Sequence, residues 1–499
     1  MSNPYSKPIT QASITFIINP MGCGIIQKKV TRNQRGSVIL FPGQFVQNLP
    51  ESIYTYYEIK DSLGSGSYGT VVSAMQKSTR EMRAIKIINK FKLQSEESRN
   101  KVINEVLILR KLDHPHIIKI YEFYEDEFNL YVVMELCKGG ELLDTIIKNG
   151  SMNEADASMF MKQILSAVFY MHSQSIVHRD LKLENMLLDC QSTKNIKIVD
   201  FGTACELPSG KKLTQMIGTI NYIAPEIFKK SYSEKCDMWS CGVIMYILLT
   251  GKLPFSAKTK KQTINLIIKG EFNMSCGEWN AISSDAKELI KKFLELNFNK
   301  RISAQDAYNM PWVQSSGVPE VNQSLIQQVI NNLTTFGDTS KFQRAVIRFI
   351  VSQLLSQAER NELDTIFKSF DTSGDGKINE KEFVVYCKKI FGSSLTEVEI
   401  KSIMTRVDTD KSGYIDYSEF LAAAMDRKKL LSMERIEKAF EAFDKDKNGK
   451  ISAQELKLML ESTTKLELDA YKRLINEVDQ NGDELVDFKE FKDMMSGLV

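Results

Sequence analysis

The spacing of apolar residues predicts both strands and helices in the first two thirds of the chain. Residues 54–60 have the pattern of a strand, and residues 100–111 have the pattern of an amphipathic helix. The apolar run 242–250 is much shorter than the roughly 20 residues that a membrane span needs, so it predicts a buried helix. Together these segments indicate a globular, mixed α and β chain.

Between residues 312 and 359 the pattern becomes amphipathic. Two apolar stripes at helical spacing follow one another, formed by Leu325, Val329, Leu333 and Phe336 and then by Phe342, Val346, Phe349 and Ile350. Lys341, Arg344 and Arg348 accompany the second stripe. Such stripes usually indicate plain helix packing, but a basic amphipathic helix also fits the apolar groove of a partner domain.

The last part of the chain repeats an oxygen-rich loop four times. The loops begin at Asp371, Asp408, Asp444 and Asp479, which is a spacing of 37, 36 and 35 residues. Oxygen side chains at positions 1, 3 and 5, a carbonyl at position 7 and a bidentate Glu at position 12 are typical of a Ca²⁺ site. The candidate ligands are Asp371, Ser373, Asp375, Lys377, Glu382, Asp408, Asp410, Ser412, Tyr414, Glu419, Asp444, Asp446, Asn448, Lys450, Glu455, Asp479, Asn481, Asp483, Leu485 and Glu490.

The fourth loop departs from this pattern at position 6, where the other three loops have glycine. This position turns the chain sharply with a positive φ, and Glu484 occupies it. A residue other than glycine pays roughly 1–2 kcal/mol for that conformation. We therefore expect the fourth site to bind Ca²⁺ about tenfold more weakly than it would with glycine.

A glycine-rich segment, residues 63–71, follows the first strand pattern. Glycines let backbone amides approach phosphates, although the same pattern occurs in dinucleotide-binding folds and in ordinary turns. Lys86 lies on the next strand pattern and can neutralise phosphates, while Glu105 on the following helix can pair with it. The alternative for this pair is a surface ion pair of little energetic value.

The segment His178–Asn185 is followed by Asp200-Phe201-Gly202 and Ala224-Pro225-Glu226. Phosphoryl transfer depends mainly on positioning and on neutralisation of charge. In such a set Asp180 would accept the proton of the substrate hydroxyl, and Lys182 would bind the γ-phosphate. Asn185 and Asp200 would hold Mg²⁺ through oxygen ligands.

These motifs, in this order, make residues 55–312 resemble the eukaryotic protein kinases, and residues 357–499 resemble calmodulin. The whole order is similar to that of the calcium-dependent protein kinases. The resemblance implies an α+β fold, with a bilobal kinase domain followed by an all-α calmodulin-like domain that has two EF-hand pairs. It implies an N-terminal extension (1–54), a kinase domain (55–312), an autoinhibitory junction (313–356) and a calmodulin-like domain with four EF-hands (357–499).

The resemblance also assigns roles to single residues. Catalytic roles fall to Lys86, Glu105, Asp180 and Lys182. ATP is expected to contact Leu63, Gly64, Gly66, Gly69, Val71, Lys86, Met134, Glu135, Cys137 and Glu141. Asp237 would brace the catalytic loop, and Glu226 would pair with Arg301. Gln215 stands where relatives place an acidic or phosphorylated residue opposite Arg179, so both Glu206 and phosphorylated Thr214 are candidates to neutralise that arginine.

We expect a Ca²⁺-activated protein kinase that uses ATP and Mg²⁺ and phosphorylates Ser and Thr. Lys182 and the pair Gly218-Thr219 indicate this specificity, and Glu141 and Glu184 indicate a basic residue N-terminal to the target, unless they are a solvated acidic rim. The junction would block the substrate cleft until Ca²⁺ fills the chain's own EF-hands, without free calmodulin. One alternative is a catalytically inactive, Ca²⁺-responsive scaffold, and another is a kinase whose EF-hands do not respond to Ca²⁺.

Composition adds three expectations. The net charge of +2 hides a balance of −7 over residues 361–499 against +9 over the rest, which fits docking of one part on the other. The 8 cysteines contain no CxxC pair and favour reduced thiols, so we expect a cytoplasmic location. We also expect no nucleic-acid partner. Met1-Ser2 lacks the glycine that N-myristoylation requires, so peripheral membrane association would need an acylated form that begins at Met21.

Overall fold

A computed structural model describes residues 47–49, 52–65, 69–190, 194–275, 277–315, 323–336, 340–391, 396–460 and 468–498. Most of the expected N-terminal extension, including the start at Met21, lies outside these residues, and so does Gly66. Within the described part, none of the helices combines the length and the apolar character that a membrane span would require.

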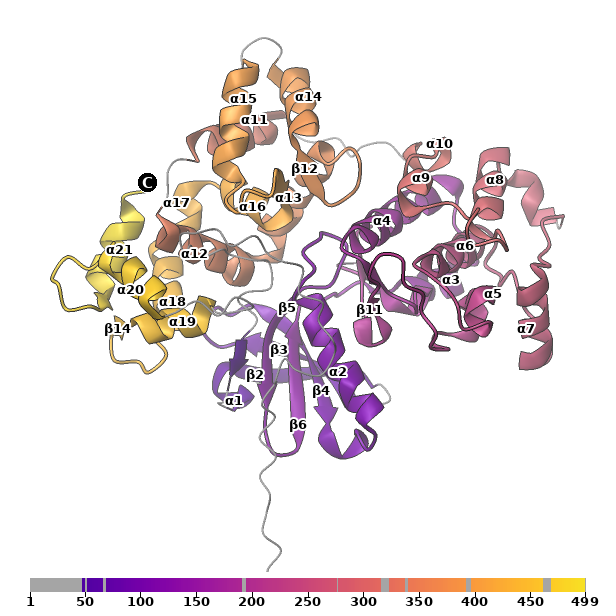
Figure 1. Cartoon of the computed structure of the whole chain (residues 1–499), viewed down its shortest axis with the longest axis horizontal. Coiled ribbons are helices and arrows are strands. Elements are labelled where there is room, and N and C mark those ends of the chain that lie inside the picture. Colours follow the sequence, from indigo (N-terminus) through magenta and orange to yellow (C-terminus); the bar gives the residue numbers. More distant parts are fainter. Residues whose placement is uncertain are drawn as a thin grey trace, which may run out of the picture. The chain divides into compact units, whose positions relative to one another are not determined.

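The N-terminal lobe is built on a six-stranded sheet with the order β1-β5-β6-β4-β3-β2 (Figure 1). Its strands are β1 (Gln47–Leu49), β2 (Tyr57–Ser65), β3 (Gly69–Gln76), β4 (Met82–Asn89), β5 (Ile120–Glu125) and β6 (Asn129–Met134). The short β1 pairs in parallel with β5, and the other neighbours are antiparallel. Helix α2 (Glu96–Leu109) follows β4, and the side chain of Ser95 accepts a hydrogen bond from the Ser98 amide at its start.

Two boundaries differ from the sequence prediction. The strand predicted over 54–60 begins only at Tyr57, because Ile53–Tyr56 form a helical turn, α1. That turn brings Ile53 and Tyr57, four residues apart, into one small apolar core. Helix α2 begins four residues before the predicted 100–111 helix and ends two residues earlier.

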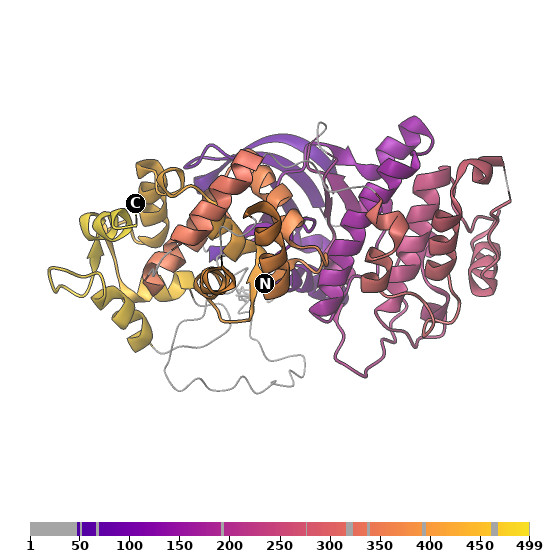
Figure 2. The same cartoon turned by 90° about the horizontal axis from the view of Figure 1, so that it is seen from above.

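The C-terminal lobe is mainly helical (Figure 2). Its helices are α3 (Leu142–Asn149), α4 (Glu154–Ser173), α5 (Pro225–Phe228), α6 (Lys235–Thr250), α7 (Lys260–Lys269), α8 (Ser284–Phe293), α9 (Ala304–Tyr308) and α10 (Pro311–Gln314). Every residue of α6 after Lys235 is buried, which confirms the buried helix predicted over 242–250. Gly242 allows the close approach of α8, since a Cβ there would lie 2.6 Å from the Cβ of Phe293.

Short strands of this lobe frame the segments that carry the kinase motifs. They are β7 (Gly140–Glu141), β8 (Ile176–Val177), β9 (Met186–Leu188), β10 (Ile196–Ile198) and β11 (Cys205–Glu206). Strand β9 pairs with both β7 and β10, and β8 pairs with β11. The catalytic loop therefore begins after β8 and ends at β9, and each of these strands is held by its own partner strands.

The C-terminal region contains the helices of four EF-hands. They are α13 (Gln357–Phe370), α14 (Glu380–Phe391), α15 (Glu397–Val407), α16 (Tyr417–Ala424), α18 (Met433–Phe443), α19 (Ala453–Leu460), α20 (Leu468–Asn476) and α21 (Phe488–Ser496), with the short α17 (Arg427–Leu430) between the pairs. Strand β12 (Lys377–Asn379) pairs with β13 (Tyr414–Asp416), and β14 (Lys450–Ile451) pairs with β15 (Val486–Asp487). The four loops thus form two pairs, as predicted.

The junction forms two helices, α11 (Gln323–Thr335) and α12 (Lys341–Phe349), the second of which continues into a π-helical turn, Ile350–Leu354. Their buried apolar residues belong to the same apolar core as the EF-hand helices. The ring of Phe342 lies 6.0 Å from that of Phe491, and Phe349 lies 5.4 Å from Phe443. The predicted stripes therefore do pack, and their packing partner is the EF-hand region.

Candidate functional site

Lys86 of the N-terminal lobe forms a close ion pair with helix α2. Lys86 on β4 places its Nζ 2.7 Å from Oε2 of Glu105 and 3.0 Å from Oε1. Glu105 is buried, so this is not the weak surface pair considered as the alternative. Burial alone would lower the pKa of Lys86, but the charges of Glu105 and Asp200 outweigh it and raise the pKa. The lysine is thus held charged beside the Asp200 segment.

The glycine-rich segment is a hairpin between β2 and β3, in which Gly64 pairs with Val71. The tip, residues 66–68, lies outside the described residues. Gly69 is required by the neighbouring strand, because a Cβ at this position would lie 1.7 Å from the carbonyl oxygen of Ile87. Strand β3 of the hairpin therefore lies directly beside β4, the strand that carries Lys86.

The hinge segment begins at the end of β6. Met134 is the last residue of that strand and pairs with Ala84 of β4. The side chain of the next residue, Glu135, is buried and forms an ion pair with the buried Lys197 at 3.0 Å. This carboxylate is therefore committed to Lys197, and Glu135 can meet a nucleotide through its backbone alone.

The catalytic loop gathers its polar groups around Asp180. The hydroxyl of Thr219 donates to Oδ1 of Asp180 at 2.7 Å, and Nζ of Lys182 lies 2.8 Å from Oδ2. The side-chain amide of Asn185 donates to the backbone oxygen of Asp180 at 2.9 Å. Asp200 takes a left-handed φ of 62°, which is a strained conformation that often marks a functional site.

Thr219 is a contact that sequence reasoning missed. The pair Gly218-Thr219 indicated Ser/Thr specificity, but no bond between the threonine and Asp180 was predicted. A hydroxyl 39 positions away in sequence can be placed there only by the path of the intervening chain.

Asp237 on α6 holds the backbone of the catalytic loop. Its carboxylate accepts the backbone N–H groups of His178 and Arg179, each at 2.9 Å, and Nε2 of His172 lies 2.9 Å away. Burial alone would raise the pKa of Asp237, but these contacts hold it below its usual value. The expected pair of Glu226 and Arg301 is likewise present, at 2.5 Å.

Arg179 has neutral partners. Its Nη1 donates to Oε1 of Gln215 at 3.0 Å, and its Nε donates to the carbonyl of Thr203 at 2.6 Å. Glu206, one of the two candidates for this role, forms an ion pair with Lys111 on the chain beyond α2. The expectation for Glu206 is therefore wrong, because its carboxylate pairs with Lys111 while Arg179 donates to Gln215 and Thr203.

An acidic cluster lies on the C-terminal lobe beside the catalytic loop. Burial and the charges of Asp144 and Glu184 together raise the pKa of Glu141. The hydroxyl of Tyr222 donates to Glu184 at 3.3 Å. These carboxylates form a local concentration of negative charge, which a basic side chain would relieve.

The four oxygen-rich loops share one geometry. The backbone N–H of position 6 donates to Oδ2 of the position-1 aspartate in each loop, at 2.8, 2.9, 2.8 and 2.8 Å. Carboxylate oxygens of the second loop (Asp408, Asp410, Glu419) and of the third (Asp444, Asp446, Glu455) each lie within 4.8 Å of one another. In the first loop, burial and the charges of Asp375 and Glu382 raise the pKa of Asp371 well above its usual value. Crowded hard oxygens of this kind fit Ca²⁺.

The left-handed backbone at position 6 is present in all four loops. It is taken by Gly376, Gly413 and Gly449 and, in the fourth loop, by Glu484 with a φ of 60°. Position 4 is left-handed as well, which sequence reasoning missed; it is occupied by Gly374, Lys411, Lys447 and Gly482. The second, third and fourth loops therefore each contain one residue other than glycine in this conformation, and the first contains none.

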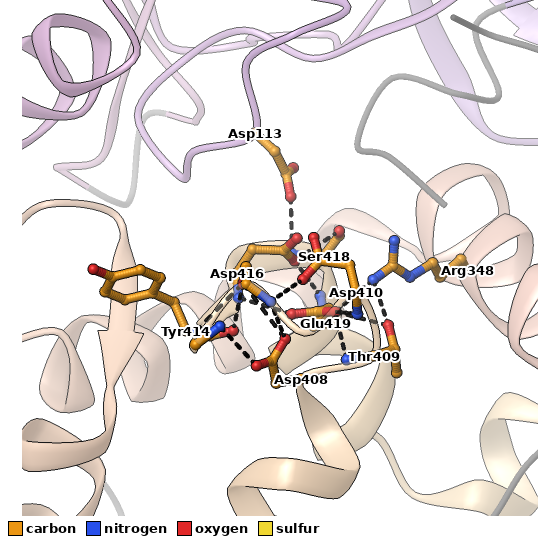
Figure 3. Close-up of polar contacts among 11 residues, drawn as sticks. Asp113, Arg348, Asp408, Thr409, Asp410, Tyr414, Asp416, Ser418 and Glu419 are labelled. Carbon is orange, nitrogen blue, oxygen red and sulfur yellow. Dashed lines mark hydrogen bonds and ion pairs between the residues drawn. The ribbon is translucent and has the colours of Figure 1, made fainter. Parts of the chain in front are cut away.

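The second loop has partners outside its own EF-hand (Figure 3). Nη2 of Arg348, on the junction helix α12, lies 2.7 Å from Oε1 of Glu419 and donates to Oγ1 of Thr409 at 2.7 Å. The backbone N–H of Ser418 donates to the carboxylate of Asp113 at 2.9 Å. Junction and kinase domain thus both contact the start of α16.

Comparisons with known proteins agree with this geometry. A family model described as "Protein kinase domain" matches residues 57–313, and one described as "EF-hand domain pair" matches residues 360–425 and 433–496. The chain is 40% identical over 485 residues to "Calcium-dependent protein kinase 4" of Plasmodium berghei (strain Anka), which covers 94% of this chain and 92% of that protein. It is 39% identical over 449 residues to "Calcium-dependent protein kinase 5" of Plasmodium falciparum (isolate 3D7), covering 89% and 78% respectively. The chain therefore belongs to the calcium-dependent protein kinases, with a serine/threonine protein kinase domain followed by two pairs of Ca²⁺-binding EF-hands.

Proposed function

We propose that this protein transfers the γ-phosphate of ATP to Ser and Thr hydroxyls of protein substrates under the control of Ca²⁺ bound to its own EF-hands. The observation that carries the proposal is the polar set around Asp180, with Thr219 and Lys182 on its two carboxylate oxygens. This set lies in the same chain as a Ca²⁺-binding region whose apolar core includes the junction.

Asp180 is the proposed catalytic base. Its carboxylate is oriented by Thr219 and Lys182, so it is held ready to position a substrate hydroxyl and accept its proton. Lys182, 2.8 Å from that carboxylate, would bind the group in transfer. Lys86, held by Glu105, would bind the phosphates of the nucleotide beneath the glycine-rich hairpin formed by β2 and β3.

Asn185 and Asp200 are the proposed Mg²⁺ ligands. The side-chain nitrogen of Asn185 is committed to the backbone of Asp180, which leaves its amide oxygen as the available ligand atom. Together with the Asp200 carboxylate it forms an oxygen donor set that suits Mg²⁺. ATP would be the phosphoryl donor, and Mg²⁺ held by these residues would neutralise the negative charge of its phosphates.

The adenine of ATP would contact Met134, Cys137 and the backbone of Glu135, which belong to the hinge segment.

For the protein substrate we propose a basic residue N-terminal to the target Ser or Thr. Burial and then the charges of Asp144 and Glu184 raise the pKa of Glu141, and a positive side chain placed among these carboxylates would relieve their repulsion.

We propose that the junction covers the substrate cleft at low Ca²⁺ and is held by the EF-hand region at high Ca²⁺. The burial of Phe342 and Phe349 among EF-hand phenylalanines supports the second of these two arrangements. Because sensor and junction belong to one chain, their effective concentration is high, and free calmodulin is not needed.

The test is phosphorylation of a peptide with Arg upstream of Ser, with Mg-ATP, in chelator and across a Ca²⁺ titration without calmodulin. We expect activation near micromolar Ca²⁺, and we expect Asp180→Asn to lower kcat by about 10²–10⁴-fold. Asp285→Asn, an exposed change on α8, is the matched control and should leave kcat unchanged. Ca²⁺-independent activity, or full activity in Asp180→Asn, would contradict the proposal.

A further inference from the structure

The position-12 glutamates of the four loops differ in one respect. In every loop, Oε1 accepts the N–H of position 3 and Oε2 accepts the N–H of position 9. Among the described residues, an ion pair to this glutamate is present in the second loop alone, between Glu419 and Arg348. The four loops therefore share one internal geometry, and the second has an added cation.

This cation comes from the junction. Arg348 is the last basic residue of α12 and is buried, with a side chain only 6% exposed, while the side chain of Glu419 is 0% exposed. Lys341, on the same helix, is exposed. A buried arginine with two partners from one loop is held in a defined geometry, unlike a long basic side chain on a solvated helix face.

We propose that Arg348 is a built-in counter-cation of the second EF-hand, which lowers the Ca²⁺ affinity of that loop and links its occupancy to the position of the junction. A bidentate Ca²⁺ ligand must present both oxygens of Glu419 to the metal, and one of them already carries a guanidinium at 2.7 Å. A positive charge held beside a cation site opposes binding of the cation.

The linkage acts in both directions. If Arg348 weakens Ca²⁺ binding at this loop, bound Ca²⁺ must weaken the contact of Arg348 with Glu419 by the same factor. The second EF-hand would then report its occupancy to α12 directly, in addition to any movement of its helices. This inference rests on the proposed function, because it assumes that the second loop binds Ca²⁺ in the intact kinase.

The affinity of the second loop can be measured by itself in the full-length chain. Tyr414 lies in this loop at position 7, so Tb³⁺ emission excited through tyrosine and lost in Tyr414→Phe belongs to it. Ca²⁺ competition against that emission gives the affinity of the second site. We expect Arg348→Gln to tighten it by about fivefold or more. Lys341→Gln removes one charge from the same helix and should stay within about twofold of the wild type.

Two further variants keep the test decisive. Arg348→Lys retains the charge and should stay close to the wild type, whereas Arg348→Met retains the apolar stem and should behave like Arg348→Gln. An unchanged or weakened second site in both Arg348→Gln and Arg348→Met would overturn the proposal. If Arg348→Gln does not fold, as judged by its circular dichroism, Arg348→Met decides the question.

Hydrogen exchange tests the reverse direction without measuring activity. In the wild type, Ca²⁺ should speed the exchange of amides at the C-terminal end of α12, and in Arg348→Gln this response should be smaller. Equal responses in both proteins would contradict the linkage. Calcium activation of the wild type is measured separately. If Arg348→Gln tightens Ca²⁺ binding at the second loop but Ca²⁺ does not activate the wild type, the proposed function is contradicted and the role of Arg348 is not.

Discussion

At the scale of single residues, the arginine of the catalytic loop, Arg179, has neutral hydrogen-bond partners. Arg179 donates to the amide of Gln215 and to a backbone carbonyl, and the hydroxyl of Tyr232 donates to the backbone oxygen of Gln215. Gln215 thus occupies the place where a phosphate or a carboxylate would otherwise pair with this arginine. Gln215 therefore connects its part of the chain to Arg179 of the catalytic loop without a phosphate group.

We therefore predict that activity depends on Gln215 and not on phosphorylation of Thr214. Gln215→Ala should lower kcat by about tenfold, since a hydrogen bond to a charged group is worth about 1.5–3 kcal/mol. Thr214→Ala should retain wild-type activity. Steady-state kinetics on dephosphorylated protein at saturating Ca²⁺ make the comparison, and a collapse of activity in Thr214→Ala would refute this view.

At the scale of elements, the second, third and fourth EF-hand loops each contain one strained position, and the first loop contains none. The cost expected for Glu484 in the fourth loop has counterparts in Lys411 and Lys447, which take the same left-handed conformation at position 4 of their loops. The fourth loop has its glycine at position 4, where the second and third loops have lysine. The strain at Glu484 therefore does not by itself set the fourth site apart from the second and third.

This comparison makes a measurable prediction. Glu484→Gly and Lys447→Gly should each tighten their own loop by a similar factor, about tenfold for roughly 1–2 kcal/mol of relieved strain. Isothermal titration of the full-length chain with Ca²⁺ would resolve the two changes. Lys445→Gly, at position 2 of the third loop, is the control and should bring no such gain. A gain confined to Glu484→Gly would show that position 4 carries no comparable strain.

The elements also show how far sequence reasoning reached. The motif residues and the loop repeat could be predicted because each depends on local spacing, as with Lys86 on its strand and the position-12 glutamates. The contacts of Arg179 with Gln215 and of Arg348 with Glu419 could not, because they join residues 36 and 71 positions apart. Only the packing of helices and loops brings such partners together, and periodicity does not encode it.

At the scale of the whole molecule, polar contacts join the kinase domain to the regulatory region. Arg83 donates to the carbonyl of Gln353 at 3.0 Å, and Lys368 lies 3.3 Å from the side-chain oxygen of Asn195. Lys119 is half-buried and lines a cavity enclosed by residues of both regions, among them Gln353 and Arg360. Burial, together with the positive charge of Arg360, lowers the pKa of Lys119 to about 7.

This lysine predicts a specific pH dependence. In the unfolded chain Lys119 binds its proton below about pH 10.4, whereas in the folded chain it does so only below about pH 7. The unfolded state binds more protons in this window, so the free energy of unfolding should rise from pH 7 to pH 10, by up to about 1.4 kcal/mol per pH unit. Lys119→Met should flatten that rise in urea unfolding series. The exposed change Lys258→Met should leave it intact, and an unaltered slope in Lys119→Met would argue against the assignment.

The shared core of junction and EF-hands has a consequence for how this protein could evolve or be re-engineered. Because Phe342 and Phe349 pack against Phe443 and Phe491, the exchangeable module is the whole stretch from residue 323 to residue 498. A foreign calcium sensor grafted after residue 356 would meet a linker shaped for other side chains. We expect working chimeras to inherit both parts from one parent, and changes at Phe342 to survive in descendants only with matching changes in the sensor.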